Sequence, residues 1–158
     1  MMSVRIPPPV LMVAAGVAQH LLAGKRKPSG ASVAGAVVLG GIGAWLDFSA
    51  LAQFRRHRTT FNPVEVENAS DLVTTGPYAV TRNPMYLGAA LEMGAYATYR
   101  RSATALLPVA LFVVLIDRLQ IPAEEAALAR KFGAKYRKYQ SRVPRWVGTA
   151  SFRPTGKG

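Results

Sequence analysis

Apolar blocks bracketed by clusters of basic residues constrain this chain more than any other feature. Residues 31–54 form one such block, with about the 20 positions that a bilayer-spanning helix requires, and they stop at the basic cluster 55–58. Residues 6–24 form a shorter block that ends at the basic cluster 25–27. The two blocks predict two transmembrane helices within residues 1–58.

The first block has a competing interpretation as a cleaved signal peptide. Pro7, Pro8 and Pro9 stand ahead of its apolar core, and no small-residue cleavage site precedes the basic cluster at 25–27. A proline at this place suits the first turn of a helix. We therefore expect the first helix to be retained.

The second half of the chain predicts further membrane-associated helices. Residues 84–99 and 103–121 are apolar and are joined by Arg100-Arg101-Ser102, which is typical of a helical hairpin. Residues 123–140 predict an amphipathic helix that lies on an anionic membrane surface. Its apolar face comprises Leu128, Phe132, Tyr136 and Tyr139.

Together these elements predict an all-α integral membrane fold with about four transmembrane helices and a C-terminal amphipathic surface helix. We interpret residues 1–158 as a single domain. Within it, residues 1–58 hold the first two helices, residues 59–147 hold the motifs that suggest chemistry, and residues 148–158 form a tail.

The net charge of +12 fits either nucleic acid or anionic lipid as a partner. Because the basic clusters flank apolar blocks and no base-reading motif is present, we expect a lipid bilayer and no nucleic acid. The positive-inside rule favours a cytoplasmic location for residues 55–58 and for the C-terminal helix. This orientation leaves five of the 20 basic residues on the far side: Lys25, Arg26, Lys27, Arg100 and Arg101.

Few residues remain for metal or thiol chemistry. Cysteine is absent and only His20 and His57 carry imidazole, so we predict no metal site. Charged residues in or beside the apolar segments are better candidates for function: Asp47, Glu92 and the pair Asp117-Arg118. Asp47 and Glu92 have two open interpretations, as partners that hold helices together or as site residues.

The segment Thr81-Arg82-Asn83-Pro84-Met85-Tyr86 is the first motif that suggests chemistry. Pro84 is placed to begin a helix, and the free N–H groups and positive dipole end of a helix start can hold a carboxylate. The structural alternative is a proline-started helix with an asparagine cap and an interfacial arginine and tyrosine.

Two adjacent carboxylates, Glu124 and Glu125, form the second motif. They follow Pro122 at the start of a predicted helix, so they could simply complement the helix dipole. Their alternative use is electrostatic, because a carboxylate favours the binding of a cationic group such as a sulfonium.

Five motifs occur in a fixed order over residues 59–147. They are Leu72-Val73-x-x-Gly76-x-Tyr78, Arg82-Asn83-Pro84-x-Tyr86-x-Gly88, Glu124-Glu125, Phe132-Gly133-x-x-Tyr136-x-x-Tyr139 and Val143-Pro144-Arg145. This order resembles that of the isoprenylcysteine carboxyl methyltransferase and phospholipid methyltransferase-like membrane proteins.

The resemblance implies an S-adenosylmethionine-dependent membrane methyltransferase with a lipophilic acceptor and an active site that faces the cytoplasm, on the inner membrane if the source is bacterial. Residues 59–147 would form its cofactor-binding catalytic region. The resemblance implies catalytic roles for Arg82, Arg118 and Glu125, with Arg118 near the acceptor. It implies that these residues lie at the cofactor: Tyr78, Arg82, Asn83, Pro84, Tyr86, Leu87, Gly88, Glu124 and Glu125.

The chain departs from the family pattern at Asn83, where the carboxyl methyltransferases usually have histidine. A neutral amide forms hydrogen bonds but does not titrate, which puts a proton-transfer role at this position in doubt. The chain is also short, so we expect a smaller acceptor than a long isoprenoid, or a groove open to lipid. A carboxylate, a thiol, an amine and a hydroxyl are all compatible acceptors.

Two other classes of function compete with methyl transfer. Membrane sterol reductases have a similar Arg-x-Pro-x-Tyr segment and use a nicotinamide cofactor, but the shortness of this chain counts against that interpretation. A non-enzymatic scaffold or transporter subunit would leave the order of the motifs unexplained, and no inverted repeat is visible.

Overall fold

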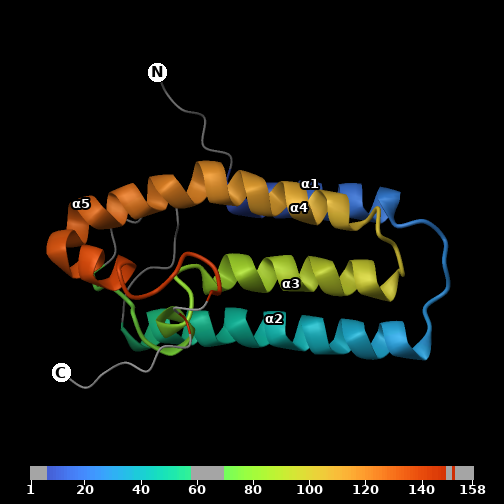
Figure 1. The fold of residues 1–158 in the computed structure, drawn as a ribbon, viewed down its shortest axis with the longest axis horizontal. Coiled ribbons are helices and arrows are strands. Elements are labelled where there is room, and N and C mark those ends of the chain that lie inside the picture. The colour runs from blue at the N-terminus through green and yellow to red at the C-terminus, as the bar shows by residue number, and fades with distance from the viewer. Residues whose placement is uncertain (1–6, 58–69, 149–150, 152–158) are drawn as a thin grey trace. The chain divides into compact units, whose positions relative to one another are not determined.

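The computed structural model describes residues 7–57, 70–148 and 151, and this part of the chain is helical, without strands (Figure 1). The α-helices are α1 (Pro8–Leu22), α2 (Gly30–Arg56), α3 (Pro84–Tyr99), α4 (Leu106–Leu115) and α5 (Ile121–Gln140). A short 3-10 helix, η2 (Gly76–Ala79), and a π-helix, η3 (Ile116–Gln120), complete the described elements. The fold class is therefore all-α.

Contacts divide the chain into two compact units. Unit 1 comprises Met1–Trp45 and Tyr86–Ala123, and unit 2 comprises Leu46–Met85 and Glu124–Gly158. Each unit joins two separate stretches of the chain, so α2, α3 and α5 each contribute residues to both.

The helix boundaries agree best with prediction at α3, which spans 84–99 as expected. Its first residue is Pro84, whose missing N–H would find no partner in the first turn in any case. The first helix has 15 residues and is shorter than the predicted range 6–24, whose first residue lies outside the described part. α2 extends slightly beyond the predicted 31–54.

The predicted interruption at residue 122 is absent. α4, η3 and α5 follow one another as a helical run of 35 residues from Leu106 to Gln140. Pro122 lacks an N–H, and in a regular α-helix its ring would crowd the carbonyl one turn earlier. The π turn of η3 widens the helix immediately before this proline, which is how the chain continues past it.

Two helical runs are long and apolar enough to cross a membrane by length and composition, Gly30–Arg56 and Leu106–Gln140. α1 is a shorter apolar helix. Two of the four predicted spans therefore meet this criterion, and the count of four remains a prediction.

Large apolar side chains on these helices are exposed. Phe48 and Val37 on α2 are 74% and 68% exposed, and Leu107 and Leu111 on α4 and Val13 on α1 are exposed as well. Water-soluble proteins rarely present such apolar surfaces, whereas lipid tails would cover them. Together with the two long apolar runs, this exposure indicates a membrane protein.

Within unit 1, small residues let α2 and α3 approach closely (Figure 1). A methyl group on Gly43 would lie 2.8 Å from the carbonyl oxygen of Gly88 and 2.8 Å from Cγ of Glu92. At Gly40 the same methyl group would lie 3.6 Å from Cβ of Ala95, an ordinary contact. The closest approach of the two helices therefore requires a glycine at position 43.

Gln19 of α1 is a buried polar residue of unit 1, with 2% of its surface exposed. Its Nε2 donates hydrogen bonds to the carbonyl oxygens of Met93 on α3, at 2.6 Å, and of Ala105 just before α4, at 3.1 Å. α1 also packs along α4 (Figure 1). One amide group thus ties the first helix to two other elements.

The core of unit 2 is built on the second half of α5. Tyr136 and Tyr139 form a buried cluster with Leu72 and Val143. Three partly buried residues of α5 pack against this cluster: Leu128, Ala129 and Phe132. The apolar face predicted for 123–140 therefore packs against the core of unit 2, and its placement on a membrane surface remains a prediction.

α5 bends at Gly133, which the sequence does not indicate. The backbone there has φ 51° and ψ −121°, a conformation that glycine alone adopts readily. Beyond the bend, the hydroxyl of Tyr139 donates a hydrogen bond of 2.7 Å to the carbonyl oxygen of Tyr78. The bent helix is thereby joined to the segment that leads into α3.

Candidate active site

The approach to the first motif is fixed by η2 and by a glycine before it. Gly76 has φ 60°, and a methyl group there would lie 2.7 Å from Nε2 of Gln53 on α2. The positive φ therefore favours glycine here, and a larger residue would also displace the side chain of Gln53. The turn buries Tyr78, and Thr81 is completely buried soon after it. The segment that leads into the motif is therefore held in place by buried residues.

The main chain after α5 lies against this motif. We call residues 141–148 the C-terminal strap. The Arg82 main-chain N–H donates to the carbonyl oxygen of Pro144 at 2.9 Å. The Thr81 hydroxyl and the Asn83 side-chain amide both donate to the carbonyl oxygen of Arg145, at 2.9 and 3.0 Å. Three consecutive residues of the motif therefore hold two consecutive carbonyls of the strap.

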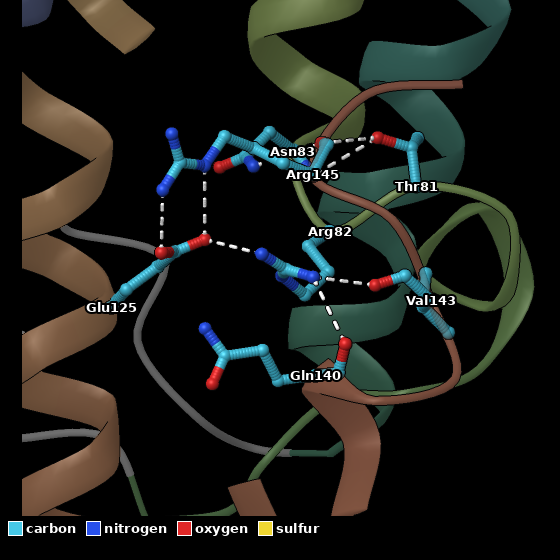
Figure 2. Close-up of polar contacts among 7 residues, drawn as sticks. All are labelled: Thr81, Arg82, Asn83, Glu125, Gln140, Val143 and Arg145. Atoms are coloured by element: carbon cyan, nitrogen blue, oxygen red, sulfur yellow. Dashed lines mark hydrogen bonds and ion pairs between the residues drawn. The ribbon is translucent and has the colours of Figure 1, made fainter. Parts of the chain in front are cut away.

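Glu125 lies between two arginines, as Figure 2 shows. Its Oε1 accepts a hydrogen bond of 2.6 Å from Nη2 of Arg82. Nε and Nη2 of Arg145 donate to its two oxygens at 3.2 and 2.8 Å. The side chains of Arg82 and Glu125 are 10% and 14% exposed, and that of Arg145 is 30% exposed. Two guanidinium groups thus share one carboxylate.

The surroundings of Glu125 keep its carboxylate charged. Burial by itself would raise the pKa of Glu125, but the hydrogen bonds from Arg145 and Arg82 outweigh burial and hold the pKa below its ordinary value. The neighbouring tyrosines respond in the opposite sense. Burial and the negative charge of Glu125 raise the pKa of Tyr136 to about 12, against the effect of Arg82. Burial also raises the pKa of Tyr78 and of Tyr139.

Arg82 has more than one partner within unit 2. Its Nη1 donates to the carbonyl oxygens of Val143, at 2.6 Å, and of Gln140, at 3.2 Å, while its Nη2 reaches Glu125 (Figure 2). Its Nε is buried and has no hydrogen-bond partner among the described residues. The side chain thus holds the strap and the carboxylate together, and retains one donor.

A second polar network lies elsewhere in unit 2. Asp71 accepts hydrogen bonds from Nδ1 of His57 at 2.7 Å and from Nζ of Lys135 at 2.9 Å. Nε2 of His57 lies 3.3 Å from the hydroxyl of Thr75, which donates to Gln53 at 2.8 Å. The network links the end of α2, the segment before η2 and the second half of α5.

The structure brings together some of the residues predicted for the site. Arg82, Asn83 and Glu125 belong to one hydrogen-bonded cluster in unit 2. Tyr78, Pro84 and Glu124 also belong to unit 2, the first two of them buried. The remaining predicted residues lie in the part of the chain assigned to unit 1: Tyr86, Leu87, Gly88 and Arg118.

Arg118 lies in η3 and is 79% exposed in its side chain. Its Nε is 3.5 Å from Oδ2 of Asp117. Asp117, which is adjacent to Arg118 in the sequence, is thus its ion-pair partner. Contact of Arg118 with a methyl acceptor remains a prediction.

Sequence reasoning gave neither Arg145 nor Thr81 a role at the site, although both stand in motifs that it recognised. Val143-Pro144-Arg145 was recognised as a motif, and that motif was the available signal for Arg145. The hydroxyl of Thr81 donates, at 2.9 Å, to the carbonyl oxygen of Arg145, which lies 64 positions further along the chain. No local sequence pattern indicates this contact.

Comparisons with known proteins identify one family. The profile of the family described as "Phospholipid methyltransferase" matches residues 31–135, which include both Arg82 and Glu125. An "Uncharacterized protein" of Haemophilus influenzae is 38% identical over 63 residues, which are 40% of this chain and the whole of that protein. No solved structure matches this chain.

Proposed function

Because this chain belongs to the phospholipid methyltransferase family, we propose that it transfers a methyl group from S-adenosylmethionine to a lipophilic or membrane-associated small acceptor. The family implies a methyltransferase of the membrane type. The exposed apolar faces of its helices support an acceptor that is reached from the bilayer.

The observation that carries the proposal is the cluster of Arg82, Glu125 and Arg145. The cluster is mostly buried, two guanidinium groups share one carboxylate in it, and the Nε of Arg82 has no hydrogen-bond partner among the described residues. Such a group suits a carboxylate, and the amino-acid end of S-adenosylmethionine carries one. Glu125 then orients the two arginines, and the neighbouring Glu124 is the proposed partner for the cationic groups of the cofactor.

The other proposed cofactor contacts come from the same motif and from the helix that follows it. Asn83 and Pro84 stand at the start of α3, where free N–H groups favour negative charge. The remaining proposed contacts are Tyr78, Tyr86, Leu87 and Gly88. When bound, the cofactor supplies a methyl group on a cationic sulfur, and the protein has to align the acceptor with it and exclude water.

Arg118 is the proposed orienting group for the acceptor. Its guanidinium offers planar, directional donors, which suit a carboxylate or another polar end of a largely apolar molecule. We further propose that the active site faces the cytoplasm, because the basic cluster that ends α2 and the basic second half of α5 follow the positive-inside rule.

Thermal unfolding of the purified protein in detergent tests the cofactor. S-adenosylhomocysteine is expected to raise the melting temperature, because a ligand that binds only the folded state stabilises it. Reduced and oxidised nicotinamide dinucleotides serve as the comparison, and stabilisation by them alone would favour a reductase. Incubating membranes with S-adenosylmethionine that carries an isotopically labelled methyl group, followed by mass spectrometry, would then identify the acceptor.

A further inference from the structure

We propose that Asn83 is a positioning residue, which holds the main chain of Arg145 so that the guanidinium of Arg145 meets Glu125. The inference rests on the proposed function, and it names a residue on which the cofactor site depends. It gives position 83 a task that requires a hydrogen-bond donor and no proton transfer.

The contacts of Arg145 are the starting point. Its carbonyl oxygen accepts two hydrogen bonds, from the amide of Asn83 at 3.0 Å and from the hydroxyl of Thr81 at 2.9 Å. The same hydroxyl accepts a hydrogen bond of 3.2 Å from the Asn83 main-chain N–H. Because Thr81 is completely buried, this clamp has little freedom to move. It fixes the backbone at the point from which the Arg145 side chain departs.

The side chain of Arg145 needs such a fixed origin. It meets both oxygens of Glu125 through two different nitrogens, and this bidentate arrangement requires the two planar groups to be aligned. A long arginine side chain loses considerable rotational freedom when it is held in one place. Fixing its main chain in advance leaves only the side-chain rotations to be ordered, so loss of the clamp should weaken the contact with Glu125 without removing either charge.

The chemistry of asparagine agrees with this task. Its amide nitrogen donates to the carbonyl of Arg145, and an amide does not titrate in the physiological range. A histidine at position 83 would also offer an N–H to the same carbonyl. Asparagine and histidine at position 83 are therefore both compatible with the holding role.

A double-mutant cycle on the full chain in detergent tests the inference, with S-adenosylhomocysteine affinity and melting temperature as the readouts. Asn83→Leu keeps the size of the side chain and removes the donor. One hydrogen bond corresponds to an affinity loss of roughly threefold to tenfold. In an Arg145→Ala background, Asn83→Leu is expected to weaken affinity by a smaller factor, because no guanidinium remains to be positioned, while still lowering the melting temperature.

The control is Ser141→Ala, which removes the hydrogen bond from the Ser141 hydroxyl to the carbonyl of Lys138 and leaves the clamp intact. Asn83→His is expected to retain affinity within about twofold, since it restores a donor. If Asn83→Leu fails to fold, Thr81→Val removes the other donor of the clamp and enters the same cycle.

The outcomes separate the inference from the proposed function. An equal loss of affinity from Asn83→Leu in the presence and absence of the Arg145 side chain would overturn the positioning role, as would failure of Asn83→His to rescue binding. If the unmodified protein does not bind S-adenosylhomocysteine, the proposed function fails and the inference falls with it.

Discussion

Arg145 donates to both carboxylate oxygens of Glu125, with Nε 3.2 Å from Oε1 and Nη2 2.8 Å from Oε2. Lysine keeps the charge but offers one ammonium group, which cannot form this bidentate contact. We expect Arg145→Lys to weaken S-adenosylhomocysteine binding nearly as much as Arg145→Ala, by roughly tenfold. Titration calorimetry would measure both variants. Affinity close to that of the unmodified protein in Arg145→Lys would show that charge alone suffices.

Removing the charge at position 125 should affect both stability and binding. Glu125→Gln leaves two guanidinium groups without the carboxylate that they share, and such hydrogen bonds contribute about 1.5–3 kcal/mol each. We expect a lower melting temperature and roughly tenfold weaker cofactor binding. Glu124→Gln tests the neighbouring carboxylate in the same assay. Unchanged affinity in both variants would show that the pair does not serve the cofactor site.

The lowered pKa of Asp71 leads us to expect that acid destabilises the fold. Hydrogen bonds from Lys135 and His57 lower the pKa of Asp71 from 3.8 to about 2. Because the pKa in the folded state lies below the unfolded value, the carboxylate stabilises the fold above pH 3.8, and this stabilisation is lost as the pH falls through about 2. We expect the melting temperature to fall in this interval, and less steeply in Asp71→Asn.

The pKa of Glu125 is also lowered in the folded state, so protonation of Glu125 at low pH destabilises the fold as well. Asp71→Asn should therefore retain part of the acid dependence of the melting temperature. Thermal unfolding in detergent between pH 5 and pH 2, set by the buffers, would record both slopes. Identical slopes for the variant and the unmodified protein would show that the network around Asp71 does not stabilise the fold.

The close approach of α2 and α3 makes a prediction with a matched control on the same helix. Gly43→Ala would place a methyl group 2.8 Å from the main-chain oxygen of Gly88, and a backbone atom cannot move aside cheaply. We expect a loss of about 1–3 kcal/mol, as for other overpacked contacts. Gly41→Ala meets nothing within 4 Å and should be tolerated. Equal melting temperatures for the two variants would contradict this account of the packing.

Arg118 offers a test of acceptor orientation. Its side chain is 79% exposed and its ion pair with Asp117 is long, so the pair should contribute at most about 1 kcal/mol. We therefore expect Arg118→Lys and Arg118→Ala to retain melting temperature and cofactor affinity. Methyl transfer should fall strongly in both, because lysine lacks the planar donors of arginine. Near-normal transfer by Arg118→Lys would show that Arg118 does not orient the acceptor through its planar donors.

The sequence predicts the parts of this protein that depend on local chemistry. α3 begins at Pro84 and ends at Tyr99 as expected, because proline favours a helix start and the apolar segment has a clear end. The same reasoning predicted a break at Pro122 and missed the π turn that carries the helix past it. A proline in the sequence indicates that one backbone hydrogen bond of the helix is lost, but it does not indicate how the helix adjusts.

The sequence predicted two of the charged residues of the candidate site, but only part of the contacts among its residues. Arg82 and Glu125 were both chosen from motifs, and Nη2 of Arg82 lies 2.6 Å from Oε1 of Glu125. Their partnership with Arg145 depends on a bend at Gly133, where a single glycine in a helical pattern looks like an ordinary interior position. Contacts of this kind arise from the path of the main chain, which a pattern of residue types leaves open.

The hydrogen bonds of Gln19 determine how the first helix meets its surroundings. In a hydrocarbon environment the amide finds no water to replace the carbonyls of Met93 and Ala105, so neither rotation nor sliding of α1 is cheap. Together with His20, whose Nδ1 lies 2.7 Å from the hydroxyl of Tyr96, Gln19 therefore sets the rotational register of the helix. This register leaves Val13, Val17 and Leu21 on the exposed side of α1, where lipid would cover them.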